Sequence, residues 1–310
     1  MEQPSLGDWL IFSCILFPLL GIDLWFQRGG RGSGKRSAVL WSVVWVCVGV
    51  FFSFYIYARW GEHAAQSYLA AYLIEKSLSL DNLFVFLLIF RAMRIPQHYQ
   101  RTALAWGIFG ALVTRGIFIG LGIAALERWG WVEYVFAALL FYAAIEALRE
   151  TQEPQAESAV VNWLAHHLPV CRDCGTARFF AREGGRLKLT PLFVTILALE
   201  STDILFAVDS VPAALAVSRH DFIVYSSNAF AILGLRALYV LLAVFISGMH
   251  YLRYGLAGVL IFAALKMITP ERYQLSPLVS VLVIVAIIGA AALASIMKTG
   301  AADEQHGKRA

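Results

Sequence analysis

Two short stretches, DNLFVF at residues 81–86 and DILFAV at residues 203–208, each place an aspartate at the start of an apolar segment and agree at three positions in register. The second stretch follows the first by 122 residues. Two further pairs match in the same order, FGALVTR (109–115) with FAILGLR (230–236) and LFYAAIE (140–146) with LIFAALK (260–266). Their offsets are 121 and 120 residues, and three ordered matches at nearly one offset indicate an internal repeat.

The composition of the whole chain indicates a lipid environment for this repeat. The 310 residues are 59% hydrophobic and 15% charged, whereas soluble domains are about 45–50% apolar and about 25% charged. This composition excludes a water-exposed surface over most of the molecule and also excludes disorder. Four cysteines are too few for a disulfide-stapled secreted module. The chain is therefore expected to lie in a bilayer.

Apolar stretches long enough to span a membrane predict an all-α, polytopic helix bundle of about nine spans. A spanning helix needs about 20 mostly apolar residues, and continuous runs of this kind favour helices over a barrel. The first run is expected to be retained as a helix, because its flank is acidic and no cleavage site follows it. The predicted spans are 6–26, 38–58, 67–90, 102–125, 132–149, 189–217, 222–249, 254–268 and 277–297.

The repeat unit contains three of these spans, so the second copy is expected to lie inverted in the membrane. Such 3+3 inverted repeats are typical of secondary transporters, whose sites lie near the midplane at the repeat interface. The predicted division is two N-terminal spans with a basic inner loop (1–66), a first repeat (67–149), a cytoplasmic loop (150–188), a second repeat (189–268), and a last span with a cytoplasmic tail (269–310).

Basic residues between the predicted spans indicate the orientation of the chain. With the N-terminus outside, 17 Lys and Arg fall on the inner side and 4 on the outer side. Cytoplasmic loops carry such an excess, so the C-terminus is expected in the cytoplasm and the protein in a bacterial inner or plasma membrane. This bias also accounts for the net charge of +4, and no nucleic-acid partner is expected.

A few charged residues fall inside the predicted spans and mark the candidate site. Each costs about 2.5–3.5 kcal/mol at mid-helix, so each needs a structural or functional reason. Helical spacing places Glu75 and Asn82 on one face, and Glu200 beside Asp203. A kink at Pro212 would bring Asp209 toward the same cavity. The predicted metal ligands are Asp81, Asn82, Glu200, Asp203, Asp209 and Glu75.

Oxygen ligands from two helices suit Mg²⁺, Ca²⁺ or Mn²⁺. The alternative is that these acids only pair with basic residues and hold the bundle together; for Arg115, Arg236 and Lys76 a counter-ion or structural role is expected. Glu146 and Lys266, at matched positions near span ends, are expected either to serve the site or to reach the interface by snorkelling.

A separate motif lies in the long inner loop. Cys171 and Cys174 form a C-x-x-C pair, and His166 and His167 precede it. In a reducing cytoplasm such a pair suggests a metal or redox site, and the alternative is a surface pair without such a role. The sequence therefore predicts a possible second, cytosolic metal or redox site.

The stretches EKSLSLDNLFVFLLIF (75–90), WGIFGALVTRGIFI (106–119) and ESTDILFAVDSVPAAL (200–215) resemble the TerC family of integral membrane proteins, including its Alx-like members. The resemblance runs from about the second to the eighth predicted span. It implies membership of the LysE-like transporter group, which is associated with tellurium resistance and manganese efflux. By resemblance, the acidic positions named above are the family's motif residues, whereas the C-x-x-C pair is not part of these motifs.

Together these features predict a non-enzymatic transporter of divalent cations, with Mn²⁺ efflux from the cytoplasm as the expected activity and protons as a possible coupling ion. No prosthetic group is expected; the expected partners are the metal ion and the lipid bilayer. One alternative is a structural or assembly partner whose buried charges form a stabilising network. Another is a tellurium-resistance component without ion flux. An intramembrane enzyme is disfavoured, because no nucleophile and base accompany the acids.

Overall fold

The structure is a computed structural model that describes residues 3–28, 35–93, 95–149, 171, 179–183, 186–235, 237–239, 251–270, 273 and 275–307. Nine helices have bounds within these residues: α1 (Leu6–Arg28), α2 (Lys35–Trp60), α3 (Glu62–Ala92), α4 (Gln97–Arg128), α5 (Val132–Leu148), α7 (Pro191–Leu215), α8 (Asp221–Ile232), α10 (Leu252–Ile268) and α11 (Pro277–Gly307). Two strands, β1 (Phe180–Glu183) and β2 (Arg186–Leu189), form an antiparallel hairpin.

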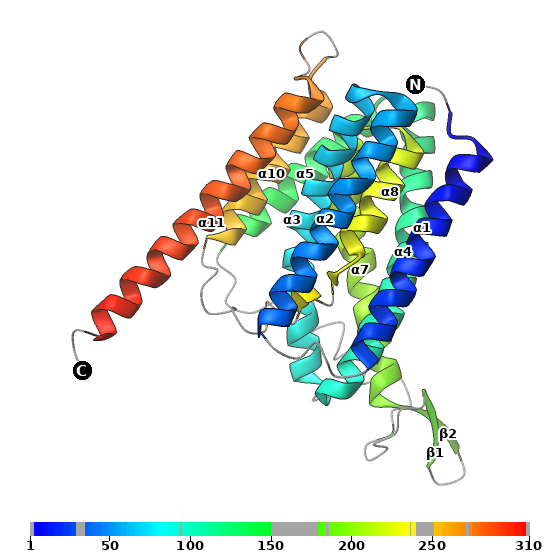
Figure 1. Cartoon of the computed structure of the whole chain (residues 1–310), viewed down its shortest axis with the longest axis vertical. Coiled ribbons are helices and arrows are strands. Elements are labelled where there is room, and N and C mark those ends of the chain that lie inside the picture. Colours follow the sequence, from blue (N-terminus) through cyan, green and yellow to red (C-terminus); the bar gives the residue numbers. More distant parts are fainter. Residues whose placement is uncertain are drawn as a thin grey trace.

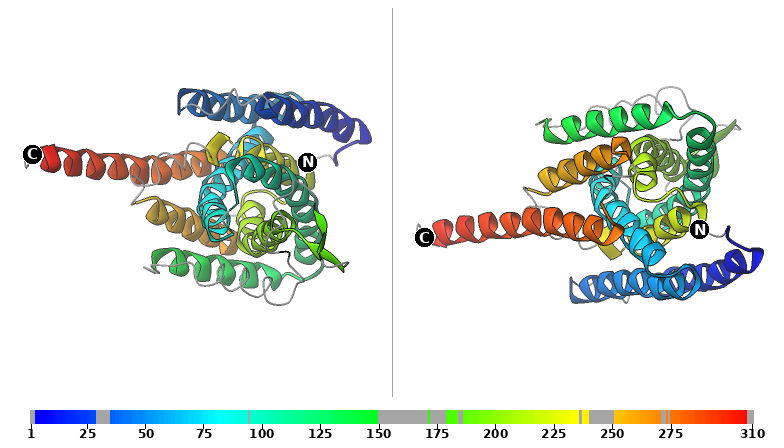
Figure 2. Two further views of the ribbon diagram at one scale, coloured as in Figure 1. Left: turned by 90° about the horizontal axis from the view of Figure 1, so that it is seen from below. Right: turned by 90° about the horizontal axis from the view of Figure 1, so that it is seen from above.

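The helices form one bundle, with the hairpin at the end where α7 begins (Figure 1). Viewed along the bundle, α3, α4, α7 and α8 lie at the centre, while α1 and α2 lie on the side opposite α5 (Figure 2). The central helices contact one another in the pairs α3–α7, α3–α8, α4–α7 and α4–α8, and α5 packs against α10. α11 packs along α3 and α10, and its C-terminal part extends away from the bundle (Figure 2).

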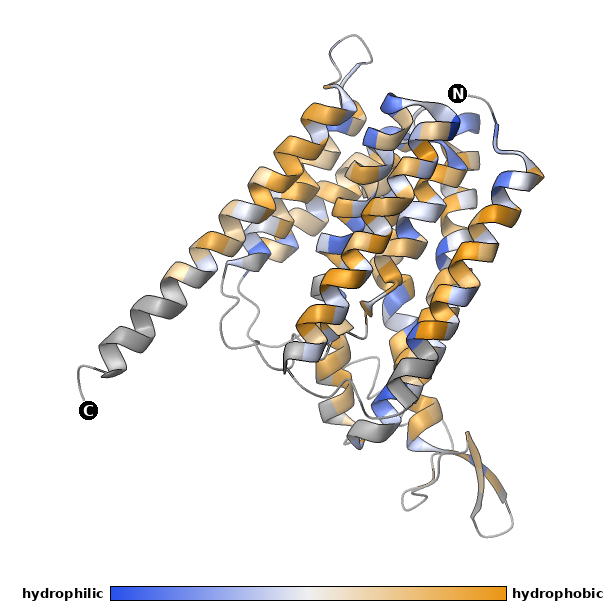
Figure 3. Ribbon diagram, viewed as in Figure 1, coloured by the Kyte–Doolittle hydropathy of each residue, from blue (hydrophilic) through white to orange (hydrophobic). Residues whose placement is uncertain are grey.

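Hydrophobic residues predominate in the outer helices α1, α2 and α11 (Figure 3). Large hydrophobic residues such as Phe17, Phe51 and Leu293 are more than half exposed there. Water would disfavour so large an apolar surface, whereas lipid tails accommodate it. The protein is therefore an all-α integral membrane protein.

Among the described residues, five helices are both long and apolar enough to cross a bilayer: Leu6–Asp23, Ser37–Trp60, Tyr99–Arg128, Pro191–Leu215 and Pro277–Ser295. The other four fall short for physical reasons. α3 has 31 residues but carries several charges, α5 and α10 have 17 residues each, and α8 has 12. The count of nine spans and the inverted repeat therefore remain predictions, as do the domain boundaries.

The seventh predicted span, 222–249, is not one continuous helix. α8 ends at Ile232, and Gly234 adopts a φ of +80°, which glycine tolerates because it has no β carbon. Helical backbone resumes at Leu235, and residues 240–250 lie outside the described part. The uniform apolar sequence concealed this break.

Two local features at the ends of α7 add to the predicted organisation. The predicted inner loop contains the β1–β2 hairpin, whose strands are joined in the register Phe180 to Leu189. α7 continues past Pro212 and ends at Leu215, so the proline lies in its last turn, and the bend expected there stays a prediction. Its start is fixed by Thr190, whose hydroxyl accepts a hydrogen bond from the Phe193 N–H at 3.3 Å.

Aromatic packing joins the N-terminal helices to the bundle, and polar contacts of Asp8 join α1 to α2. Phe52 of α2 packs on Phe230 of α8 with ring centroids 4.5 Å apart. The ring centroids of Trp9 in α1 and Phe222 in α8 are 5.0 Å apart. The buried Asp8 carboxylate accepts hydrogen bonds from the Tyr55 hydroxyl at 2.8 Å and from Arg59 Nε at 3.1 Å. These contacts hold α1 and α2 against one side of the central helices.

Candidate functional site

The centre of the bundle contains a buried arginine that binds two acids from different helices. Arg115 of α4 is only 2% exposed, and its Nη1 donates to Glu75 Oε2 of α3 at 2.6 Å. Its Nη2 donates to Asp203 Oδ1 of α7 at 3.2 Å, and its Nε lies 3.4 Å from the second Asp203 oxygen. A buried charge needs such partners, because desolvation costs several kcal/mol per ion. Arg115 therefore joins α3, α4 and α7 at one point.

Two neutral side chains complete the contacts of Arg115. Its Nη1 lies 3.2 Å from the Ser210 hydroxyl of α7 and 3.5 Å from Asn228 Oδ1 of α8. Asn228 was not among the predicted site residues, although an asparagine within an apolar run is a signal that could have identified it. The guanidinium thus contacts three helices besides its own, and all the central helices meet at this site.

Several polar atoms beside Arg115 are buried without a hydrogen-bond partner in the part of the chain that the structure describes. They are Glu75 Oε1, Ser79 Oγ and Asn228 Nδ2. Glu75 and Ser79 are four residues apart on α3 and so lie on one face of it. Buried polar groups are nearly always paired, and an orphan commonly marks a site for water or an ion. On the α3 side of the Arg115 cluster, Glu75 Oε1 and Ser79 Oγ therefore remain available to bind a water molecule or an ion.

Glu200 lies one turn before Asp203 on α7 and faces α4 at Gly110. A β carbon built on Gly110 would overlap the Glu200 carboxylate, so only glycine leaves space for that group. The Glu200 side chain is half-buried and close enough to Asp203 to repel its charge. The two acids of α7 thus lie along the same side of α4, as their helical spacing predicts.

The remaining predicted ligands are less closely joined. Asp209 is partly buried and close enough to interact electrostatically with Glu75. Asn82 is buried within α3, and Asp81 belongs to α3, but its side chain lies outside the described part, as does Arg236. Among the residues that can be described, no three His, Cys, Asp or Glu side chains come close enough together to hold a metal. Arg115 instead occupies the space between two of the acids.

Lys76 does not act as a counter-ion to an acid in the described structure. Its Nζ donates to the carbonyl oxygens of Ala231 at 2.9 Å and Leu233 at 3.1 Å. These carbonyls belong to the end of α8, where the helix break leaves them without helical donors. The side chain of Lys76 therefore caps a broken helix from the neighbouring α3.

The positions near the span ends and in the inner loop are separate from this cluster. Glu146 is exposed and lies 3.7 Å from Arg149, whereas Lys266 is buried and donates to the Ser280 hydroxyl at 2.8 Å. Cys171 is buried and disulfide-bonded, and its backbone N–H donates to the Leu189 carbonyl at 2.9 Å. The other members of the predicted loop site, His166, His167 and Cys174, lie outside the described residues.

This combination defines a class of protein: a polytopic helical membrane protein with a buried cluster of ionisable side chains at its centre. Comparison with known proteins gives the family. Residues 60–303 match the model of the "Integral membrane protein TerC family", and the chain belongs to this family. The matched region begins at the end of α2, so it contains every residue of the Arg115 cluster.

Three relatives cover nearly the whole chain. An "Uncharacterized membrane protein STKORF319" of Myxococcus xanthus is 38% identical over 96% of this chain and 95% of its own. A "Putative membrane-bound redox modulator Alx" of Escherichia coli K12 is 36% identical over 90% of this chain and 91% of its own. An "Uncharacterized membrane protein" of Rickettsia bellii is 32% identical over 96% of this chain and 100% of its own. No solved structure matches the chain.

Proposed function

We propose that this protein transports a divalent cation across the bilayer, with Mn²⁺ exported from the cytoplasm, and that it is not an enzyme. The observation that carries the proposal is the buried group Glu75–Arg115–Asp203 in the middle of a membrane helix bundle. Ionisable residues inside a membrane are costly, and they mark ion pathways by default. Mn²⁺ is proposed from the family resemblance together with the oxygen character of the available ligands.

The charges in the cluster favour a cation as the transported species. Four acids interact in pairs, Glu75 with Asp203 and Asp209, and Glu200 with Asp203. Arg115 is the described basic residue bound to two of them, Glu75 and Asp203. An entering divalent ion would compete with the guanidinium for the same carboxylates. We propose that metal binding displaces Arg115 from at least one acid, with Glu75 Oε1 and Ser79 Oγ as the first free ligands.

The proposed architecture has nine spans, an external N-terminus, a cytoplasmic C-terminus and two inverted repeats. Under the repeat, α3 corresponds to α7, α4 to α8, and α5 to α10. Helix packing supports this proposal, because the contacts α3–α8 and α4–α7 exchange with each other when the two repeats are exchanged. The contact α5–α10 maps onto itself in the same operation. The Arg115 cluster would then lie at the repeat interface, where transporters of this design bind their substrates.

Export needs a source of energy. Moving a divalent cation outward against about 100 mV, negative inside, costs about 4.6 kcal/mol, at about 2.3 kcal/mol per charge. Inward movement of protons would supply this energy, and clustered acids are suitable proton carriers. We therefore propose proton coupling as part of the function.

Flux in proteoliposomes tests the proposal. The purified full-length protein should move Mn²⁺ down a gradient, and Glu75→Gln and Asp203→Asn should each lower the rate by at least tenfold. Glu146→Gln is the matched control, because that acid is exposed and lies outside the cluster. Screening Ca²⁺, Mg²⁺ and Zn²⁺ alongside Mn²⁺ would define selectivity. Absence of flux for every metal, with normally folded protein, would refute transport and favour a structural charge network.

A second candidate function is modulation of a membrane redox state. Two observations favour it: Cys171 is disulfide-bonded, and the Alx relatives carry the name "Putative membrane-bound redox modulator". Cys171→Ser should then change the redox response of cells and leave Mn²⁺ flux in proteoliposomes at the wild-type rate. A Cys171→Ser strain whose redox response matches the wild type would remove this candidate.

A further inference from the structure

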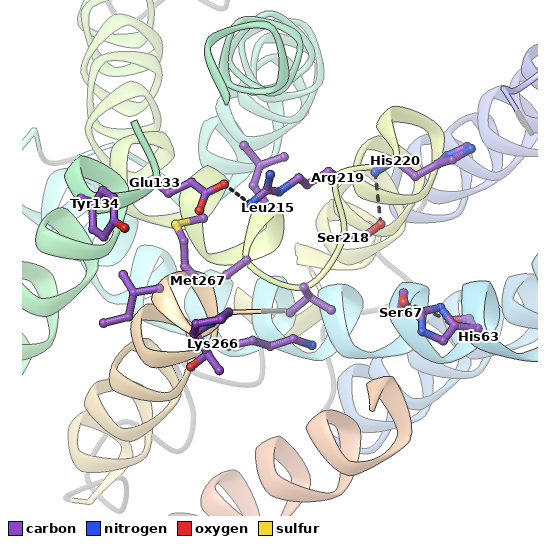
Figure 4. A pocket seen from close by; sticks show the side chains of 15 residues that line it. His63, Ser67, Glu133, Tyr134, Leu215, Ser218, Arg219, His220, Lys266 and Met267 are labelled. Carbon is purple, nitrogen blue, oxygen red and sulfur yellow. Dashed lines mark hydrogen bonds and ion pairs between the residues drawn. The ribbon is translucent and has the colours of Figure 1, made fainter. Parts of the chain in front are cut away.

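A cavity separate from the Arg115 cluster lies at the end of the bundle opposite the hairpin. It has a volume of about 670 Å³ and is formed by the N-terminal turns of α3 and α5 and the C-terminal ends of α7 and α10 (Figure 4). A water molecule takes roughly 30 Å³ of liquid volume, so the cavity is large enough for a small solute. Its polar lining includes Lys266, Arg219, His63, His220 and Glu133.

Lys266 is the unusual member of this lining. Its side chain comes from the last turn of α10 and is only 7% exposed. Its Nζ donates to the Ser280 hydroxyl at 2.8 Å, and Ser280 in turn lies 3.2 Å from the Ser276 carbonyl oxygen. No carboxylate in the described residues lies within ion-pair distance of Lys266. A buried ammonium with a single neutral partner retains most of its desolvation cost.

The other charges of the cavity do not neutralise Lys266. Arg219 and Glu133 form an ion pair with each other, which Figure 4 shows on the opposite wall. His63 and His220 add no negative charge in either protonation state. The lining therefore carries one net positive charge from Lys266, rising further if a histidine is protonated.

A simpler role for Lys266 is to balance the negative C-terminal end of α10. That effect contributes about 0.3–1 kcal/mol for an exposed side chain and does not require burial beside a cavity. The simpler role also predicts that stability is independent of which anions are present. The two interpretations are thus separable by experiment.

We propose that this cavity binds a small oxyanion, of the carboxylate or phosphate class, with Lys266 as its charge partner. The ammonium has donors left after its bond to Ser280, since a lysine carries three. The oxyanion would supply the acceptors and the negative charge that the described lining of the cavity does not. The source is either a free anion or the phosphate of a lipid headgroup at the membrane surface. This inference does not depend on the proposed cation transport.

Thermal unfolding of the full-length protein in maltoside detergent micelles, which contain no phosphate, tests the site. Replacing chloride by inorganic phosphate or acetate at constant ionic strength should raise Tm by a few degrees in a saturable way. Lys266→Met should abolish this rise. Arg128→Gln is the control, because it removes a cation near the same end of the bundle that does not line the cavity, and it should leave the rise unchanged.

Two further measurements define the ligand and the limits of the proposal. Ser280→Ala removes the hydrogen-bond partner of Lys266, so its Tm should depend more strongly on phosphate than that of the wild type. Adding phosphatidylglycerol to the micelles distinguishes the sources: a Lys266-dependent rise in Tm that soluble phosphate no longer increases indicates a lipid headgroup. The proposal is overturned if wild-type Tm is the same in every anion and lipid, or if Lys266→Met retains the full rise.

Discussion

Gly110 of α4 lies directly against the carboxylate of Glu200 on α7 and leaves no space for a β carbon. The overlapping group is the end of a flexible side chain, so Gly110→Ala should displace the carboxylate without unfolding the bundle. We expect a loss of Mn²⁺ flux similar to that of Glu200→Ala, with a stability cost of at most about 1–3 kcal/mol.

Gly107→Ala is the matched control for this change. Gly107 lies one turn earlier on the same helix, and nothing lies within 4 Å of its added β carbon. Its flux should equal that of the wild type, and its unfolding temperature should be equal or higher, because alanine stabilises a helix interior by about 0.5–1 kcal/mol relative to glycine. If both alanine variants transport normally, the placement of Glu200 against α4 is irrelevant to function.

Removing Arg115 should destabilise the bundle strongly. Arg115→Met leaves Glu75 and Asp203 buried without their shared partner, which costs about 3–5 kcal/mol. Arg115→Lys should rescue only in part, since an ammonium cannot reproduce the planar fork of donors. The measurement is denaturant unfolding of the purified protein in detergent.

The double variant Glu75→Gln/Arg115→Met tests whether the effect comes from the ion pair. It should be less destabilised than the sum of the two single variants, because it leaves fewer uncompensated buried charges. Strict additivity would show that Glu75 and Arg115 are not energetically coupled.

Lys76 should be replaceable by a soluble amine. Lys76→Ala removes the donor to the Ala231 and Leu233 carbonyls, and a buried acceptor without a partner costs about 1–3 kcal/mol. Propylammonium has N–H groups and resembles the deleted side chain, so millimolar additions should raise the unfolding temperature of this variant and not of the wild type.

Tetramethylammonium provides the control for this rescue, because it carries the same charge and no N–H donor. It should have no effect on Lys76→Ala. Equal rescue by both cations would mean that charge alone, and not the capping of the α8 carbonyls, is the contribution of Lys76.

Alanine substitutions at two glycines with similar φ values should distinguish the cost of backbone strain from the cost of a steric clash. Gly61 and Gly234 have φ values of +84° and +80°, but an added β carbon meets nothing within 4 Å at Gly61 and meets the Trp45 side chain at 2.5 Å at Gly234. Gly61→Ala should cost about 1–2 kcal/mol from the left-handed conformation alone. Gly234→Ala should cost clearly more in the same unfolding assay.

A smaller residue at position 45 should relieve only the second effect. Trp45→Leu in the Gly234→Ala background should recover stability relative to the Trp45→Leu single variant, and it should not help Gly61→Ala. If Gly61→Ala and Gly234→Ala are equally destabilised, the contact between α2 and the α8 break has no measurable influence.

The sequence predicted the helices well because hydrophobicity alone determines them. The range 132–149 was expected to be helical and α5 covers Val132–Leu148, and 254–268 was expected where α10 covers Leu252–Ile268. The break after α8 was not predicted, because it is stabilised from outside, by Lys76 of another helix. The acceptors of Lys76 are backbone carbonyls, which no side-chain pattern reveals.

The residues of the Arg115 cluster could be identified from the sequence, but the hydrogen bonds between them could not. Charges inside apolar runs identified Glu75, Arg115 and Asp203 from local sequence alone. Which acid binds which base depends on contacts 40 and 88 residues apart in the chain, and helix packing decides those distances. Gly110 also escaped notice, since its importance comes from the carboxylate that faces it on another helix.

The position of Lys76 also sets an order for the biogenesis of this protein. Its carbonyl acceptors lie 155 and 157 residues further along the chain, so α3 enters the membrane long before the end of α8 has been synthesised. Until then, the lysine has no α8 carbonyls to bind and has to be sheltered from the lipid in another way. The contacts of α3 are thus incomplete until α8 has been made, and a chain truncated before α8 should be a substrate for membrane quality control.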